Sequence, residues 1–267
     1  MARDSALKPF YSALLLAFVC SFLVSSASVG LHSRQQANQQ LDRQKNILRA
    51  AGLYREGIPV AQLFAAIDSR IIDLRSGKFV SVKEINPKKF DQRQAVNNPK
   101  ISHSLAKSTD IAGLRRLEDY SWVYLVKKDN KISQVILPIR GSGLWSMMYG
   151  YLALNSDLNT IRGITFYEHG ETPGLGGEIE NPAWQAGWQG KKIYNQSGKV
   201  DFKVVKGGVK TKGAAALHQV DGISGATLTS NGVDKLLHFW FGNYGFKPFL
   251  ERMRRRINHG RTLTSLN

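Results

Sequence analysis

The chain has 267 residues, of which 42% are hydrophobic, so it holds enough apolar material for a packed domain and is unlike a disordered chain. Its formal net charge of +17 favours an anionic partner, which could be nucleic acid, an acidic lipid surface or an acidic protein subunit. The single cysteine, Cys20, excludes an intramolecular disulfide and any cysteine-based zinc or iron–sulfur site built by this chain alone.

The first apolar segment lies close to the N-terminus. No formally charged residue occurs between Lys8 and Arg34, and residues 10–31 (FYSALLLAFVCSFLVSSASVGL) reach the ~20 residues that cross a bilayer. A cleavable signal peptide is the alternative, because Arg3 and Lys8 form a short basic start and small residues follow at 25–28. Since the apolar run exceeds the usual ~7–15-residue signal core, we expect a single, uncleaved transmembrane helix.

After the anchor, the pattern predicts a helix and then a loop. Residues 34–54 are polar with a thin apolar stripe, which predicts a helical stalk that is broken near Gly52 and Gly57. Residues 60–74 predict a packed amphipathic helix in a soluble core that starts near residue 55. Residues 83–108 are polar, carry two prolines and predict a loop.

Strand patterns dominate the following part of the chain. Runs rich in Val, Ile and aromatic residues occupy 122–126, 132–138, 161–167 and 200–205, and helical patterns occupy 181–188 and 231–241. Strands grouped between helices, without regular alternation, predict a mixed α+β domain.

The expected organisation has five parts. They are an anchor over 1–33, a stalk over 34–54, a membrane-proximal part of the soluble domain over 55–135, its second part over 136–247, and a basic tail over 248–267. The tail carries five arginines, which form either a solvated face or a surface for lipid headgroups: Arg252, Arg254, Arg255, Arg256 and Arg261.

Residues 221–230 (DGISGATLTS) carry the clearest chemical signal. Small hydroxyl residues and glycines stand just before an amphipathic helical pattern. Such a place suits a phosphate, because the first amides of a helix lack partners and the helix dipole favours negative charge. On these grounds alone an ordinary N-cap by Thr229 or Ser230 is the alternative.

This segment resembles the flavinylation motif of FMN-binding domains, which ends in Ser/Thr-Gly-Ala-Thr on the modified threonine. The resemblance implies an FMN joined through its phosphate to Thr227, with Ser224, Gly225 and Ala226 beside it. It also implies a separate flavin transferase, whose recognition sequence includes Asp221. We therefore expect no catalytic residue in this chain.

Residues 169–176 (HGETPGLG) resemble the segment of these domains that lies along the isoalloxazine ring. The resemblance implies that Leu175 is an apolar platform and that the turn holding Thr172 and Gly174 supplies backbone hydrogen bonds. Taken alone, Pro173-Gly174 is merely a turn. Residues 141–145 (GSGLW) resemble the family's Gly-rich segment, so Trp145 is expected to wall the pocket, with a buried core tryptophan as the alternative.

Two further polar features are weaker. Lys206 occupies a position where the family often has a lysine near the flavin, and it is either a phosphate contact or a solvated residue at a strand end. His169 and Glu171 lack a third ligand at a known spacing, so we expect no metal site.

The resemblance extends to nearly the whole chain. The anchor, residues 41–48 (LDRQKNIL) and residues 239–242 (FWFG) are similar to the C subunits of sodium-translocating NADH:quinone reductases. This implies an electron-carrier subunit of a bacterial inner-membrane complex that oxidises NADH, reduces ubiquinone and exports sodium, with the FMN-binding domain over 136–247 facing the periplasm. The NADH, quinone and sodium sites would lie in the other subunits, membrane lipid would account for the positive charge, and nucleic acid is not expected.

Two alternatives stay open. The G subunit of ferredoxin:NAD oxidoreductase complexes also resembles this domain, although the stalk and the length favour the quinone reductase. A basic, membrane-tethered binding module without a cofactor belongs to a different class and predicts a colourless purified protein.

Overall fold

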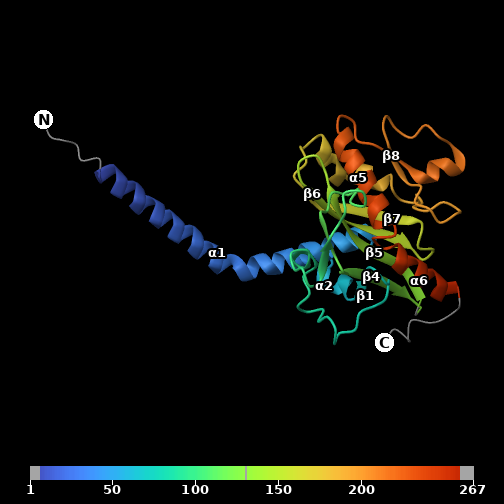
Figure 1. The fold of residues 1–267 in the computed structure, drawn as a ribbon, viewed down its shortest axis with the longest axis horizontal. Coiled ribbons are helices and arrows are strands. Elements are labelled where there is room, and N and C mark those ends of the chain that lie inside the picture. The colour runs from blue at the N-terminus through green and yellow to red at the C-terminus, as the bar shows by residue number, and fades with distance from the viewer. Residues whose placement is uncertain (1–6, 130, 259–267) are drawn as a thin grey trace. The chain divides into compact units, whose positions relative to one another are not determined.

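The computed structural model describes residues 7–129 and 131–258 of the chain (Figure 1). The chain divides into two compact units, with the boundary between Arg43 and Gln44. Helix α1 (Leu7–Ala50) starts in the first unit and ends in the second. Each unit has a distinct physical character, the first apolar and solvent-exposed, the second packed around a sheet.

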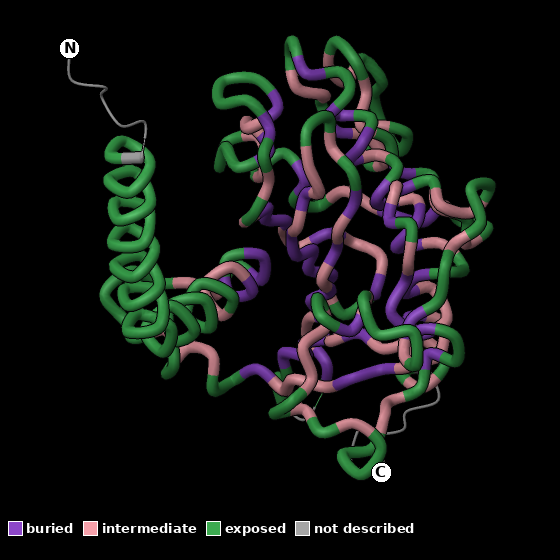
Figure 2. Tube along the Cα trace, turned by 60° about the vertical axis from the view of Figure 1, so that its left-hand side comes forward, coloured by how far each residue is buried: buried purple, intermediate pink, exposed green. Residues whose placement is uncertain are grey.

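The first unit contains the predicted anchor. Helix α1 is long and apolar enough to cross a membrane. Large apolar side chains are exposed along this segment, as in Phe10, Leu16 and Phe18. The first part of the helix is coloured as exposed in Figure 2. So much exposed hydrocarbon is unfavourable in water, which makes lipid the suitable environment for these side chains. The helix ends before Gly52, as the sequence predicts.

The packed core begins earlier than residue 55. Ile47 and Leu48 at the end of α1 are fully buried, and they pack with Tyr124, Ile136 and Tyr151. The last turns of the predicted stalk therefore belong to the soluble unit. A thin apolar stripe predicts a helix, but it does not say which surface the helix covers.

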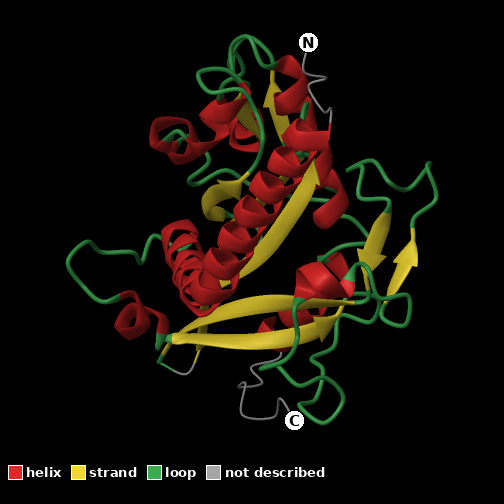
Figure 3. Ribbon diagram, turned by 90° about the vertical axis from the view of Figure 1, so that its left-hand side faces the viewer, coloured by secondary structure: helices red, strands yellow, loops and turns green. Residues whose placement is uncertain are grey.

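A five-stranded antiparallel sheet organises the second unit (Figure 3). Its strand order is β1-β4-β5-β6-β7, formed by β1 (Ile67–Asp73), β4 (Tyr120–Lys128), β5 (Lys131–Ser142), β6 (Met147–Asn155) and β7 (Ile161–Glu168). Tyr124 pairs with Ile136 on the face that the end of α1 covers, while Leu125 pairs with Val135 in the main core. The sheet is buried on both faces, which explains the long apolar runs in β4 and β5.

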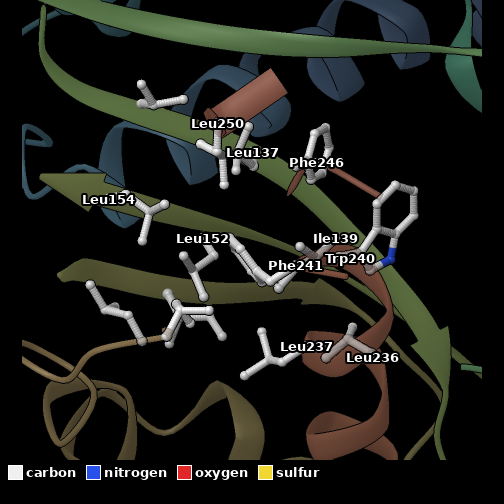
Figure 4. Close-up of a cluster of buried hydrophobic side chains, with 14 of the residues drawn as sticks. Leu137, Ile139, Leu152, Leu154, Leu236, Leu237, Trp240, Phe241, Phe246 and Leu250 are labelled. Atoms are coloured by element: carbon white, nitrogen blue, oxygen red, sulfur yellow. The ribbon is translucent and has the colours of Figure 1, made fainter. Parts of the chain in front are cut away.

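Two helices cover the main-core face. In Figure 4, Leu236, Leu237 and Trp240 of α5 (Thr227–Trp240) lie near Ile139 and Leu152 of the sheet. Helix α6 (Lys247–Asn258) follows after a short turn. This packing places the first turn of α5 at one end of β5 and β6.

The predicted basic tail is wrong for residues 248–258. They form most of α6, whose Phe249, Leu250 and Met253 are each 1% exposed in the main core. The arginines occupy the other positions of this amphipathic helix, so an arginine-rich sequence hid an apolar face. Arg261 lies outside the described residues.

The remaining elements are short. They are α2 (Val60–Phe64), α3 (Gln92–Ala95), β2 (Ser102–Ser104), β3 (Arg116–Glu118), η1 (Gly176–Glu180), α4 (Pro182–Ala186), β8 (Lys203–Val205), η2 (Gly213–His218) and β9 (Gln219–Asp221). Strands β2 and β3 pair antiparallel, and β8 and β9 pair parallel. Residues 83–108 are mostly turns, bends and irregular chain, as predicted for a loop, and contain only the short α3 and β2.

The α+β class is confirmed, but several elements differ from prediction. The helix expected over 60–74 stops at Phe64, and β1 follows, because pairing with β4 outweighs the helical period of an isoleucine-rich segment. Strand β6 was not predicted. The strand over 200–205 and the helix over 181–188 are shorter than expected.

Candidate functional site

Thr227 is the first residue of α5 and is exposed. The preceding Gly225 has φ +73°, a backbone conformation that favours glycine, and the N-cap residue Ala226 supplies no side-chain cap. The first amides of α5 therefore remain available at the point where the Thr227 hydroxyl meets solvent.

The predicted alternative, an N-cap by Thr229 or Ser230, is wrong. Both residues lie within the first turn of α5 and are buried. Thr229 Oγ1 donates a hydrogen bond to Glu171 Oε2 at 2.5 Å, and Ser230 Oγ accepts one from the amide of Ile223 at 2.9 Å. These hydroxyls tie the helix to neighbouring segments, and Thr227 presents the exposed hydroxyl of the turn.

A pocket of about 430 Å³ opens beside Thr227. Four of the predicted site residues line it, together with Asp221, which the resemblance predicts to belong to the transferase-recognition sequence. Its lining consists of Val204, Lys206, Gly207, Gly208, Asp221, Gly222, Ile223, Ser224, Gly225, Thr227, Ser230 and Asn231. Lys206 brings a positive charge to the same pocket as the threonine hydroxyl, an arrangement that suits a phosphate.

Asp221 holds this pocket together. Its Oδ1 accepts a hydrogen bond from the amide of Val209 at 2.7 Å, and its carbonyl oxygen accepts one from Trp184 Nε1 at 2.8 Å. In the folded chain Asp221 thus joins β9 to the loop that follows Lys206. Asp221 therefore has a structural role in the folded chain, whatever its role in recognition by a transferase.

The 169–176 segment lies against the threonine motif. A β-carbon placed on Gly225 would lie 3.0 Å from Leu175 Cδ2, so the Leu175 side chain touches this turn. The carbonyl oxygen of Thr172 accepts hydrogen bonds from the amides of Leu175 and Gly177, and Gly174 has φ +73°. This tight turn holds Leu175 44% exposed beside the motif.

Trp145 is 69% exposed, so the alternative of a buried core tryptophan is wrong. It lies between β5 and β6, and its amide donates to Glu171 Oε1 at 3.0 Å. Among the described residues, neither Trp145 nor Leu175 lines the pocket beside Thr227. The pocket beside Thr227 and the exposed side chains of Trp145 and Leu175 are therefore separate, neighbouring parts of the candidate site.

Glu171 is 4% exposed and connects these parts. It accepts hydrogen bonds from the amides of Leu144 and Trp145 and from the hydroxyl of Thr229. Burial by itself would raise the pKa of Glu171, but the hydrogen bonds from Thr229, Trp145 and Leu144 outweigh it and hold the pKa below its ordinary value. The carboxylate is thus ionised and fully engaged.

Three residues beside the candidate site were not predicted to belong to it: Glu171, Leu144 and Leu228. From sequence Glu171 was considered only as a metal ligand, and within the described residues no group of three or more His, Cys, Asp or Glu side chains could hold a metal. Leu144 and Leu228 are 47% and 60% exposed next to the predicted residues. Leu228 does not lie on the apolar face of α5. An apolar residue outside that face was the sequence signal that could have identified it.

The chain is similar to known proteins over nearly its whole length. It is 46% identical over 257 residues, covering 95% of this chain and 98% of its relative, to the C subunit of the Na(+)-translocating NADH-quinone reductase from Pseudomonas aeruginosa. The chain belongs to this family of C subunits. A family model described as FMN-binding domain matches residues 143–242, and the Yersinia pestis C subunit is likewise 46% identical, over 94% of each chain.

Solved structures agree with this family. The crystal structure of Shewanella oneidensis NqrC matches with a TM-score of 0.75 and 39% identity, over 82% of this chain and 99% of that one. The C subunit from Parabacteroides distasonis matches with a TM-score of 0.62 and 29% identity, over 82% of this chain and 96% of that one. In the present member of the family, the exposed hydroxyl, the lysine-lined pocket and the nearby exposed apolar side chains fit the phosphate and the flat ring of an FMN.

Proposed function

We propose that this chain is the electron-carrying C subunit of a sodium-translocating NADH:quinone reductase and that it holds FMN through a phosphoester bond to Oγ1 of Thr227. The observation that carries the proposal is the exposed Thr227 hydroxyl at the start of α5, beside a pocket that also contains Lys206. FMN in such a site accepts electrons from one redox centre and passes them to the next.

The phosphate end of the site is built by three kinds of donor. The unpartnered first amides of α5 favour an anion, Lys206 adds a positive charge, and Ser224 adds a hydroxyl to the same pocket. Gly225 lets the backbone turn closely in front of the helix. Attachment needs no base in this chain if a separate flavin transferase makes the bond.

The ring end of the site is built by exposed apolar side chains. Leu175 lies against Gly225, and Trp145 lies on the neighbouring loop that Glu171 holds. An exposed tryptophan and leucine gain from being covered by a flat aromatic ring, which also excludes water from one side of it. The turn of Thr172 and Gly174 keeps Leu175 in place.

The rest of the reaction belongs to partner subunits. In our proposal they hold the NADH, quinone and sodium sites, because this chain shows none of the corresponding motifs. Helix α1 is long and apolar enough to cross a membrane. In our proposal it anchors the chain in a bacterial inner membrane, and the FMN-binding domain faces the periplasm. Identity of 46% to C subunits of the NADH-quinone reductase favours this complex over the ferredoxin:NAD oxidoreductase alternative.

The decisive experiment is mass spectrometry of the chain produced together with a flavin transferase. The tryptic peptide that contains Thr227 should carry one FMN less one water, and Thr227→Ala should abolish covalent flavin because it removes the only proposed attachment oxygen. Thr211→Ala, which changes another exposed threonine, should keep full flavin content. The same added mass on Thr229 or Ser230 would show that the assignment is wrong, and a colourless wild-type protein would support the cofactor-free binding module.

A further inference from the structure

A buried carboxylate joins three segments that are far apart in the sequence. Glu171 Oε1 accepts the amide of Trp145 at 3.0 Å, and Glu171 Oε2 accepts the amide of Leu144 at 3.2 Å and the hydroxyl of Thr229 at 2.5 Å. The residues come from the β5–β6 loop, the loop after β7 and the first turn of α5. One side chain thus bonds to both of the other segments at this end of the sheet.

The space around the carboxylate is equally restricted. A β-carbon on Gly143 would collide with Glu171 Oε1, and one on Gly176 would lie 2.5 Å from Thr229 Oγ1 and 2.8 Å from Glu171 Oε2. The two glycine positions therefore admit the carboxylate and its hydroxyl partner. The amide of Glu171 donates to His169 Nδ1 at 3.1 Å, which fixes the backbone from which the side chain projects.

We propose that Glu171 is the positioning residue of the flavin site: its carboxylate holds the loop that carries Trp145 against the first turn of α5 and so sets the surroundings of the flavin ring. The inference rests on the proposed function for its link to the flavin, but the loop contact stands on the structure alone. Glu171 acts through Leu144, Trp145 and Thr229, and it need not touch the cofactor itself.

Leaving a buried donor without its acceptor costs more free energy than forming the hydrogen bond contributes. Backbone amides that donate to a carboxylate are held more strongly than those that donate to a neutral oxygen. Replacing Glu171 with Gln keeps the side-chain volume but removes the charge and turns one of the two acceptor oxygens into a donor group. The amides of Leu144 and Trp145 then lose part of their anchorage, and Trp145 gains freedom.

Hydrogen exchange of the full-length, detergent-solubilised chain tests the loop contact directly. In Glu171→Gln, the amides of the 143–148 segment should exchange roughly tenfold faster or more, since a hydrogen bond to a charged group contributes at least that factor. Thr229→Val removes one donor from the carboxylate and leaves both loop amides in place, so its effect should be smaller and in the same direction.

Asp157 offers a matched control at the opposite end of β6 and β7. Its carboxylate also accepts two amides, from Asn159 and Thr160, and one hydroxyl, from Thr160. Asp157→Asn should therefore loosen its own turn but leave exchange in the 143–148 segment unchanged. Unchanged exchange of that segment in both Glu171→Gln and Thr229→Val would overturn the proposal.

The flavin readout separates this inference from the proposed function. In the flavinylated chain, Glu171→Gln should retain covalent FMN but shift its absorption and reduction potential relative to wild type and Asp157→Asn. Faster exchange with an unshifted spectrum and potential would overturn the link between Glu171 and the flavin. Exchange measured in the chain produced without a flavin transferase, and so without covalent flavin, tests the loop contact even if Thr227 proves not to be the attachment residue.

Discussion

At the scale of single residues, the site combines polar atoms that are fully engaged with apolar side chains that are not covered. Glu171 and Thr229 are buried and hydrogen-bonded, whereas Trp145, Leu175 and Leu228 are exposed. Scattered exposed apolar residues are ordinary, but neighbouring ones beside a polar pocket are typical of a ligand site. Substituting the exposed apolar side chains and substituting the buried polar ones should therefore have different effects.

Removing the apolar cover should alter the flavin without releasing it. Trp145→Ala and Leu175→Ala should each keep covalent FMN, because in our proposal attachment depends on Thr227. Water admitted to the ring stabilises its reduced, charged form, so the reduction potential should rise by on the order of 30 mV, equivalent to ~1.4 kcal/mol for a two-electron couple. Spectroelectrochemical titration measures the shift.

The control for this prediction is Tyr244→Ala, which removes an aromatic side chain that is 56% exposed beyond the end of α5. It should leave the potential unchanged. Wild-type spectra and potentials in both the Trp145 and Leu175 variants would mean that neither side chain packs on the ring.

Protonation of Glu171 should reveal its contribution to stability. Since its pKa in the folded chain lies below the ordinary value of 4.5, ionised Glu171 stabilises the fold above that pH, and the stabilisation is lost as the pH falls through the folded-state pKa. Glu171→Gln should be less stable than wild type at pH 7, and the difference in free energy of unfolding should shrink below about pH 4.5. Urea unfolding across this range measures it, and a pH-independent difference would contradict the prediction.

At the scale of secondary-structure elements, helix α5 connects the site to the core. Its first turn carries Thr227, while Leu236, Leu237 and Trp240 are fully buried. Trp240 Nε1 also donates to the carbonyl oxygen of Arg140 in β5 at 2.7 Å. Packing of the C-terminal half of α5 in the core thus fixes the position of its exposed first turn. A functional site is held more precisely on such a rigid element than on a loop.

Helix α6 should behave as part of the core and not as a tail. Leu250→Ala removes a side chain that is 1% exposed and should cost ~2–5 kcal/mol of unfolding free energy, because it leaves a cavity. Arg255→Ala, on an exposed position of the same helix, should stay within about 0.5 kcal/mol of wild type. Denaturant unfolding of both variants measures the difference, and equal stabilities would place α6 outside the cooperative unit.

At the scale of the whole molecule, the positive charge and the anchor pose a question of topology. Basic residues lie on both sides of the apolar segment, with Arg3 and Lys8 before it and Arg34, Arg43 and Arg49 after it. Simple counting would keep the soluble domain in the cytoplasm. That rule applies mainly to short loops, and large domains cross the membrane largely regardless of their charge.

We therefore predict a cytoplasmic N-terminus and a periplasmic FMN-binding domain. A basic start ahead of an apolar core is what the export machinery reads first, so the rest of the chain is translocated. Protease added to intact spheroplasts should digest the flavin domain, while a cytoplasmic marker protein stays protected. Digestion only after lysis would place the domain in the cytoplasm and contradict the prediction.

The candidate site residues were predicted from short segments that resemble those of FMN-binding domains. The structure brings the Ser-Gly-Ala-Thr run and the turn before Leu175 together at one end of the sheet. Glu171 could not be assigned in this way. Its partners at 144, 145 and 229 are defined only after β5, β7 and α5 have packed, and no spacing along the chain encodes them.

The sequence by itself determined the features that depend on composition and short-range pattern: the apolar N-terminal helix, the α+β class, the strand runs of β4, β5 and β7, and a helix after the threonine motif, although α5 begins at Thr227 and not at 231 as predicted. Only the tertiary structure decided that Ile67 to Asp73 is a strand, that the end of α1 and the arginine-rich α6 belong to the core, and that Trp145 is exposed. The physical reason is that the hydrophobic period of a segment shows which side chains share a face of a helix or strand. Burial and strand pairing depend on which other elements pack against that face. A carboxylate such as Glu171 acquires its task only from the segments that fold around it.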